Sequence, residues 1–252
     1  MVHIVGAGAG DPELITVKGQ RLLNSADVVI YAGSLVNPEL LKFCKEDAEI
    51  FNSAEMTLEE VIHVIEVANA AGKDVVRLHT GDPSIYGAIQ EQIDILTEKS
   101  IEFEIVPGVS SFLAAAATLK QEFTLPGITQ TVILTRQSGI TPVPDSESLK
   151  NLAKIESTIC VFLSVKLIDK IVEDLLAAGL TPNSSIAVVY KASWDEEKIL
   201  RGTLETISAQ VKESGITRTA LVIVGKCLNS KRYENSHLYS PKFSHMFRRA
   251  KS

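Results

Sequence analysis

The sequence contains little cysteine, with 3 thiols in 252 residues, at Cys44, Cys160 and Cys227. An odd number of thiols this far apart fits neither the disulfide framework of a small secreted domain nor the spacing of a zinc site. We therefore expect reduced structural thiols. The chain begins with a strand-like segment, residues 1–6 (MVHIVG), and no basic stretch precedes it, which predicts no signal peptide and a cytoplasmic protein.

Long apolar runs are also missing, because no window approaches the roughly 18 consecutive apolar residues of a membrane-spanning helix. The hydrophobic content of 45% nevertheless excludes a disordered chain. A chain of this length can bury the core of one large domain or of two ordinary ones. The sequence therefore predicts a globular protein without a membrane partner.

Basic residues are scarce outside the C-terminus. The chain has 25 basic and 31 acidic side chains, and residues 229–252 hold six of the basic and one of the acidic ones. The remaining 19 basic and 30 acidic side chains give the body a charge of −11, which predicts no nucleic-acid partner. We interpret the basic tail, which includes Arg248, Arg249 and Lys251, as a solvated terminus or a subunit contact.

Familiar catalytic arrangements are absent as well. The 5 histidines show no metal-ligand spacing, and the sequence has no recognisable Ser-His-Asp or Cys-His order. We expect no metal site and no dedicated side-chain nucleophile.

The sequence does contain a regular alternation of short β-branched runs with helical periods, which predicts an α/β fold with largely parallel sheets. The clearest helix begins at Thr57, whose capping-box partner is Glu60, and ends near Gly72. A second helix covers residues 167–176 and ends at Gly179. The expected strands are residues 2–5, 28–31, 49–51, 75–78, 103–106, 132–135, 159–163, 186–190, 198–201 and 221–224.

Residues 120–130 are irregular and include a Leu-Pro-Gly turn at 125–127, which predicts a domain boundary. We expect two α/β domains, residues 1–122 and 123–229, followed by the basic tail at residues 230–252.

A glycine-rich segment, residues 5–16 (VGAGAGDPELIT), follows the first strand. Such a segment is typical of dinucleotide sites, where a pyrophosphate approaches backbone N–H groups. Here Asp11 stands at the position of the third glycine, and residues 32–34 (AGS) lack the acid that binds a ribose. A nicotinamide or flavin site is therefore disfavoured. A plain helix start with Pro12 and Glu13 is the alternative interpretation.

Two further segments follow strands. Residues 78–87 (LHTGDPSIYG) end the fourth strand, at the edge where open α/β sheets bind ligands. An ordinary turn capped by Asp82 is the alternative. Residues 106–112 (VPGVSSF) follow the fifth strand, and their small side chains would let a helix approach closely while two hydroxyl groups stay available for binding.

In this order and spacing, the three segments resemble those of the tetrapyrrole methylase family, the S-adenosylmethionine-dependent enzymes of corrin and sirohaem synthesis. The resemblance extends along nearly the whole chain, up to Lys226, and includes residues 201–204 (RGTL) and 220–225 (ALVIVG).

Three stretches are similar to the family members that methylate carbon 11 of precorrin-4: residues 135–144 (TRQSGITPVP), 162–165 (FLSV) and 190–194 (YKASW). We expect the cobalt-containing ring as the substrate. Many relatives carry Met where Leu163 stands, which predicts a different contact around the methionine end of the cofactor.

The resemblance implies two α/β domains with a cofactor cleft between them, S-adenosylmethionine as the cofactor, and a homodimer. Asp11 and Tyr86 are the candidates for a base that takes a proton during methylation. The cofactor contacts that the resemblance implies are Pro12, Thr80, Gly81, Asp82, Ile85, Ser110, Ser111, Leu163, Ala192 and Ala220.

The substrate of such an enzyme is a tetrapyrrole with many carboxylates, which needs local cations on an acidic protein. Arg136 is the first candidate, followed by Lys191, Lys166 and Arg218, and each is alternatively a solvated surface charge. Trp194 would cover a flat ring or fill the core of the second domain.

Other functions stay open. One is another tetrapyrrole methylation, on uroporphyrinogen III or a different precorrin, and a second is a non-catalytic tetrapyrrole carrier. A third is a related methylase acting on a translation factor or a ribosomal RNA, which the acidic body and the Arg136 loop disfavour.

Overall fold

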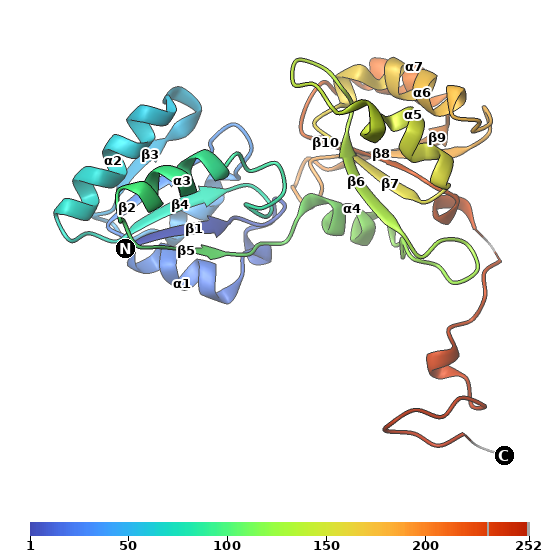
Figure 1. Ribbon diagram of the computed structural model, residues 1–252, viewed down its shortest axis with the longest axis horizontal. Coiled ribbons are helices and arrows are strands. Elements are labelled where there is room, and N and C mark those ends of the chain that lie inside the picture. The colour runs from blue at the N-terminus through green and yellow to red at the C-terminus, as the bar shows by residue number, and fades with distance from the viewer. Residues whose placement is uncertain (231, 251–252) are drawn as a thin grey trace. The chain divides into compact units, whose positions relative to one another are not determined.

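The protein forms two α/β units in the computed structural model, which describes residues 1–230 and 232–250 (Figure 1). The α/β fold class predicted from the sequence is confirmed. The basic-tail residue Lys251 lies outside the described residues. Unit 1 consists of Met1–Ala115 and Lys191–Glu197, and unit 2 of Ala116–Tyr190 and Lys198–Ser252.

The chain passes from unit 1 to unit 2 inside helix α4 (Ser111–Leu119). It returns to unit 1 only for the segment Lys191–Glu197. The domain limits drawn from the sequence at residues 122 and 229 stay a proposal.

Unit 1 is built on a five-stranded sheet in which all neighbouring strands are parallel. The sequence predicted each strand to within one residue at either end. The strands, in the spatial order β3-β2-β4-β1-β5, are β1 (Val2–Gly6), β2 (Val28–Tyr31), β3 (Glu49–Asn52), β4 (Val75–His79) and β5 (Phe103–Val106).

Helices cover both faces of this sheet, with α1 below and α2 and α3 above it in Figure 1. Leu23 of α1 belongs to the core on one face, whereas Ile65 of α2 and Leu96 of α3 belong to the core on the other. The predicted capping box is confirmed, because Thr57 and Glu60 each accept a hydrogen bond from the other's backbone N–H. The helices are α1 (Val17–Ser25), α2 (Leu58–Ala70) and α3 (Gln90–Glu98).

Unit 2 contains a second five-stranded sheet, for which the expectation of largely parallel strands is wrong. Only β6 and β7 are parallel, and the other three strand pairs are antiparallel. The crossover through helix α6 (Ile168–Ala177) does connect two parallel strands, β7 and β8, but β10 lies between them in the opposite direction. The strands, in the order β6-β7-β10-β8-β9, are β6 (Val132–Arg136), β7 (Thr158–Phe162), β8 (Ser185–Tyr190), β9 (Lys198–Thr203) and β10 (Ala220–Val224).

One core of unit 2 contains residues of three helices, including Leu149 of α5, Ile171 of α6 and Ile207 of α7. These helices are α5 (Leu149–Leu152), α6 (Ile168–Ala177) and α7 (Ile207–Ser214). Short 3-10 helices complete the two units: η1 (Pro12–Leu14), η2 (Pro38–Phe43), η3 (Ser53–Glu55), η4 (Asp145–Glu147), η5 (Ala153–Ile155), η6 (Val165–Leu167), η7 (Lys226–Asn229) and η8 (His237–Tyr239).

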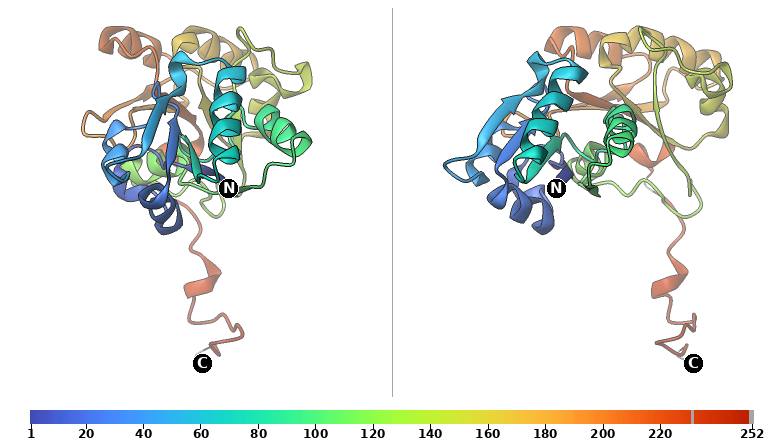
Figure 2. Two further views of the ribbon diagram at one scale, coloured as in Figure 1. Left: turned by 90° about the vertical axis from the view of Figure 1, so that its left-hand side faces the viewer. Right: turned by 60° about the vertical axis from the view of Figure 1, so that its left-hand side comes forward.

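The tail contributes no strand to either sheet in its described part, residues 232–250, and its short helix η8 is visible in the red end of the chain in Figure 2. Arg248 donates hydrogen bonds to the carbonyl oxygens of Leu238 and Ser240, at 2.5 and 2.8 Å. The guanidinium group of Arg248 therefore stabilises the tail's own conformation.

The three cysteines are free thiols. Burial raises the pKa of Cys160 to about 12 and raises that of Cys44. Neither thiol is therefore a ready thiolate nucleophile. Among the described residues, no helix is long and apolar enough to cross a membrane.

Candidate functional site

The three segments singled out in the sequence meet at one edge of the unit 1 sheet. They follow β4, β1 and β5, which are neighbours in the sheet and parallel, so their carboxyl ends lie together. Helix α1 leaves β1 toward one face, and α3 leaves the β4 side toward the other. The edge between β1 and β4 is thus a topological switch point, where open α/β sheets bind their ligands.

Backbone contacts hold the segments together. Gly8 and Gly81 exchange two hydrogen bonds, with N–O distances of 3.3 and 2.8 Å. Gly6 and Gly108 approach so closely that a Cβ atom added to Gly6 would lie 2.6 Å from the Cα of Gly108. Packing between protein segments therefore requires glycine at both positions, and no ligand contact is needed to explain these two glycines.

Asp82 connects the second segment to the third. Its Oδ1 accepts a hydrogen bond from the backbone N–H of Ser84 at 2.8 Å, which makes it the turn cap of the alternative interpretation. Its Oδ2 accepts from the N–H of Gly108 at 2.9 Å. The carboxylate therefore fixes the relative position of the two loops.

The backbone at Gly81 differs from that of the packed glycines. Gly81 has a φ of +60°, and an added Cβ atom would meet nothing nearer than the Cα of Ser110, at 3.5 Å, and the N of Ser111, at 3.7 Å. A side chain here would occupy space beside two serines. Both distances are ordinary van der Waals contacts, so the positive φ, and not a lack of room, favours glycine at this position.

Asp11 caps the short helix that begins at Pro12. Its Oδ1 accepts a hydrogen bond from the N–H of Glu13 at 2.9 Å, and its own N–H donates to Oγ of Ser193 at 3.1 Å. The plain helix start considered for this segment is therefore present. Asp11 is half-buried.

Trp194 packs against the glycine-rich loop within unit 1, so the interpretation that it fills the core of the second domain is wrong. A Cβ atom added to Gly10 would lie 2.0 Å from Cδ1 of the indole, and the indole N–H donates to the carbonyl of Ala9 at 3.2 Å. Lys191 lies over the same ring, with its Nζ 4.8 Å from the ring centroid and 3.1 Å from Oε1 of Glu196. The ammonium group is thus already engaged by the protein.

The remaining unit 1 candidates are Thr80 and Ile85, beside the turn at residues 81–83, and Ala192 in the segment Lys191–Glu197. The hydroxyl of Thr80 donates to the carbonyl of Leu35 at 3.4 Å, Ile85 is half-buried, and Ala192 is buried. Tyr86 is 42% exposed and has a φ of +56°, which is unusual for an aromatic residue. An outlier of this kind next to the turn favours a functional role for this loop.

Three candidates belong to unit 2 and share one edge of its sheet. Arg136 ends β6 opposite Phe162, the last residue of β7, and Leu163 follows at once. Ala220 begins the antiparallel strand β10, so it lies at the same edge. Lys166 and Arg218, the other cation candidates, are exposed.

The sequence did not single out two buried polar residues of β4, Arg77 and His79. His79 is 4% exposed, and desolvation, together with the charge of Arg77, lowers its pKa to about 3. Burial lowers the pKa of Arg77 to about 10, and Arg77 donates hydrogen bonds to Gln92 and to the carbonyl of Ile30. The signal was the polar alternation in residues 75–79 (VVRLH), within a strand that otherwise has an apolar pattern.

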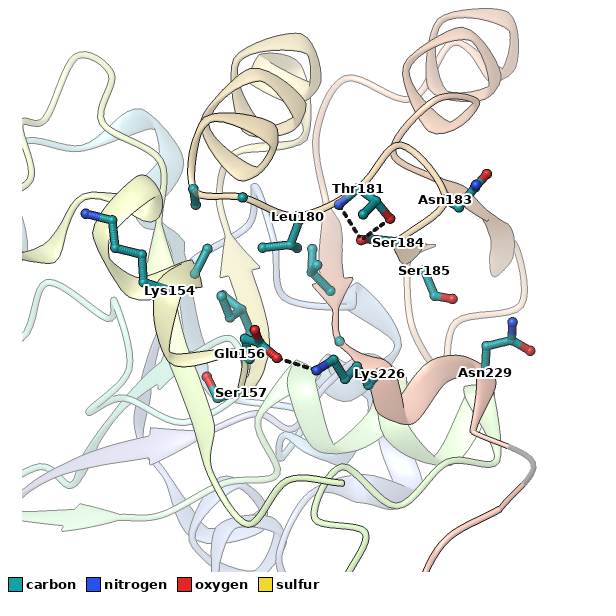
Figure 3. A pocket seen from close by; sticks show the side chains of 16 residues that line it. Lys154, Glu156, Ser157, Leu180, Thr181, Asn183, Ser184, Ser185, Lys226 and Asn229 are labelled. Carbon is teal, nitrogen blue, oxygen red and sulfur yellow. Dashed lines mark hydrogen bonds and ion pairs between the residues drawn. The ribbon is translucent and has the colours of Figure 1, made fainter. Parts of the chain in front are cut away.

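A cavity of about 670 Å³ lies elsewhere in unit 2, among the first residues of β7 and β8 and the end of β10 (Figure 3). Its charged groups are engaged with their neighbours, because Lys226 pairs with Glu156 and Lys154 donates to Asn151 at 2.9 Å. None of the predicted site residues lines it.

Comparison with protein families matches residues 1–208 to the tetrapyrrole (corrin/porphyrin) methylases. Over 249 residues, the chain is 57% identical to the cobalt-precorrin-4 C(11)-methyltransferase of Methanocaldococcus jannaschii, covering 99% of this chain and 96% of that protein.

Two solved structures are also similar. A cobalt precorrin-4 methyltransferase superposes with a TM-score of 0.89 and 47% identity, covering 91% of this chain and 96% of the other. A uroporphyrin-III C-methyl transferase of Thermus thermophilus, complexed with S-adenyl homocysteine, gives a TM-score of 0.76 and 30% identity, covering 90% and 93% of the two chains.

Proposed function

Because the chain belongs to the tetrapyrrole (corrin/porphyrin) methylases, we propose that it is a methyltransferase that methylates carbon 11 of cobalt-precorrin-4 in cobalamin synthesis. The observation that carries this proposal is the 57% identity to a cobalt-precorrin-4 C(11)-methyltransferase over 99% of the chain. The similarity of the fold to that of a cobalt precorrin-4 methyltransferase also supports it.

The methyl donor of this reaction is S-adenosylmethionine, and we place it at the switch point of unit 1. The glycine at position 81 supports this placement, because no side chain beside Ser110 and Ser111 holds a ligand off its backbone. A related protein, the uroporphyrin-III C-methyl transferase, was solved with S-adenyl homocysteine. In this proposal Pro12, Thr80, Ile85 and the other unit 1 residues drawn from the family resemblance line the same site.

When bound, the cofactor supplies an electrophilic methyl group on a sulfonium, which is a good leaving group. The task of this chain is therefore to align the ring carbon with that methyl, a contribution worth up to about 7–11 kcal/mol when the attack geometry is maintained. The hydrogen bonds of Asp82 and the Gly8–Gly81 pair give the loops the rigidity that alignment needs. In this role Asp82 positions backbone groups.

Loss of a proton from the methylated ring requires a base or water. Asp11 and Tyr86 are our candidates. Asp11 uses one carboxylate oxygen as a helix cap, which leaves the other oxygen to accept a proton in a fixed position. Asp11→Asn and Tyr86→Phe variants separate the two, because only the variant of the true base lowers kcat without weakening cofactor binding.

The carboxylates of the ring require cations. Arg136 is the better candidate, since its half-buried side chain lies at the edge that also carries Leu163. Lys191 is the weaker one because it is paired with Glu196.

We further propose that the enzyme acts in the cytoplasm as a homodimer, without a nucleic-acid or membrane partner, as the family resemblance and the acidic composition suggest.

Ligand-dependent stability tests this proposal. S-adenosylhomocysteine at 100 times its dissociation constant should stabilise the protein by about 2.7 kcal/mol, whereas NAD should not. A melting temperature that responds to NAD and not to S-adenosylhomocysteine would contradict the proposed cofactor. Transfer of labelled methyl to the corrin ring then distinguishes an enzyme from a tetrapyrrole carrier.

A further inference from the structure

We propose that Ser164 is a positioning residue for this methyl transfer, whose hydroxyl fixes both Leu163 and Arg136 at the edge of the unit 2 sheet. The inference rests on the proposed function, because it assigns Leu163 to the cofactor and Arg136 to the ring carboxylates.

The hydroxyl of Ser164 connects the ends of two neighbouring strands. Its Oγ donates a hydrogen bond to the carbonyl of Phe162, at 2.6 Å, and accepts one from the backbone N–H of Gln137, at 2.9 Å. Phe162 ends β7 and Gln137 directly follows β6. Ser164 is 1% exposed, so water does not compete for these bonds.

The residue held by this contact is strained. Leu163 lies between the carbonyl acceptor and the serine, has a φ of +54°, and leaves 57% of its surface exposed. A leucine in the left-handed region is unfavourable, and exposure gives it no packing energy in return. Such a conformation persists only where its surroundings impose it, and it occurs most often at ligand sites.

The contact also reaches Arg136. Gln137, whose backbone N–H donates to Ser164, is buried, and its Nε2 donates to Oδ2 of Asp174 on α6, at 2.6 Å. Arg136 precedes Gln137, and its Nε is buried without a hydrogen-bond partner in the part of the chain that the structure describes. Gln137, the residue that follows Arg136, is therefore anchored twice, by Ser164 and by Asp174 of α6.

A single hydroxyl thus fixes a residue assigned to the cofactor and a residue assigned to the substrate. When it is removed, Leu163 relaxes and must be returned to its strained conformation at the expense of binding. We expect Ser164→Ala to raise the dissociation constant of S-adenosylhomocysteine about tenfold and to raise the KM of the corrin substrate, without loss of the fold.

Ser157 provides a matched control. It is another buried serine of unit 2, 5% exposed, just before β7 where Ser164 is just after it. Its Oγ has no hydrogen-bond partner among the described residues. Ser157→Ala should therefore leave both constants within twofold of the wild-type values.

Leu163→Gly tests whether Ser164 acts through the conformation of Leu163, because glycine adopts a positive φ without help. In that background, adding Ser164→Ala should change S-adenosylhomocysteine affinity by less than threefold. A tenfold loss in both backgrounds would show that Ser164 does not act through Leu163 and would overturn the inference.

Calorimetric titration of S-adenosylhomocysteine into the full chain, with circular dichroism as the check on folding, gives the answer. Ser164→Cys, which preserves the shape and weakens the hydrogen bonds, replaces Ser164→Ala if that variant does not fold. If the wild-type protein does not bind the ligand, the proposed function fails. If it binds but Ser164→Ala behaves like Ser157→Ala, the proposed function stands and the inference fails.

Discussion

At the scale of single residues, different physical requirements explain the glycines of the candidate site. Gly6 and Gly10 are required because protein atoms occupy the position of a side chain. Gly81 has a positive φ, and an added Cβ atom would make only ordinary van der Waals contacts with Ser110 and Ser111. Sequence spacing alone does not distinguish these cases, since it reports where glycines occur and not what lies against them. Of these three glycines, only Gly81 has room for an added Cβ atom, and it is the one that we propose as a ligand contact.

Gly81→Ala should abolish binding of S-adenosylhomocysteine, because in the proposed site the new methyl group would hold the ligand off the backbone. It should also cost about 1–2 kcal/mol of stability, because alanine is strained at positive φ. Gly72→Ala is the matched control, since Gly72 has a φ of +70° with no atom within 4 Å of an added Cβ. It should lose the same stability and no affinity. Unchanged affinity in Gly81→Ala would remove this turn from the cofactor site.

His79 should make the fold acid-sensitive. Its pKa is lowered to about 3, so the unfolded chain, with an ordinary histidine pKa near 6.5, binds a proton that the folded chain rejects. The free energy of unfolding should therefore decrease as the pH falls from about 6.5 toward 3, by up to about 1.4 kcal/mol per pH unit. Urea titrations between pH 7 and 4.5 should show a shallower decrease in His79→Leu. Equal slopes for both proteins would refute this account.

At the scale of elements, sequence reasoning succeeded where geometry follows from strand direction. Residues that follow parallel strands meet at one edge, and the three loops of unit 1 do so. It failed for unit 2, because β10 lies antiparallel between β7 and β8, and the residues of a strand do not encode its direction. The contact of Trp194 with Gly10 could not be predicted from the sequence either, since 184 positions separate the two residues in the chain.

Because the glycine-rich loop contacts the Lys191–Glu197 segment, substitutions in the two segments should have coupled effects on the free energy of unfolding. Gly10→Ala should cost about 1–3 kcal/mol, because the new Cβ overlaps the indole of Trp194. In a Trp194→Ala background the same substitution should cost clearly less, since the obstacle is gone. Denaturant unfolding of the four proteins measures this coupling. Additive effects would mean that the loop and the indole do not pack as described.

At the scale of the whole molecule, the net charge suits only one of the two proposed ligands. The net charge of −6 suits a cationic cofactor and disfavours a polyanionic ring. The ring must therefore find its cations at particular positions, of which Arg136 is our first candidate. Composition predicts no nucleic-acid or membrane partner, but it does not identify the residues that select the substrate, which we propose from the family resemblance and the fold.

The central claim is tested most directly by locating the transferred methyl group. The full-length protein is incubated with cobalt-precorrin-4 and S-adenosylmethionine labelled with ¹³C in its methyl group, and the product is analysed by NMR and mass spectrometry. We predict one labelled methyl group per ring, attached to carbon 11. A ring that is bound but unlabelled, or labelled at another carbon, would contradict the proposed function.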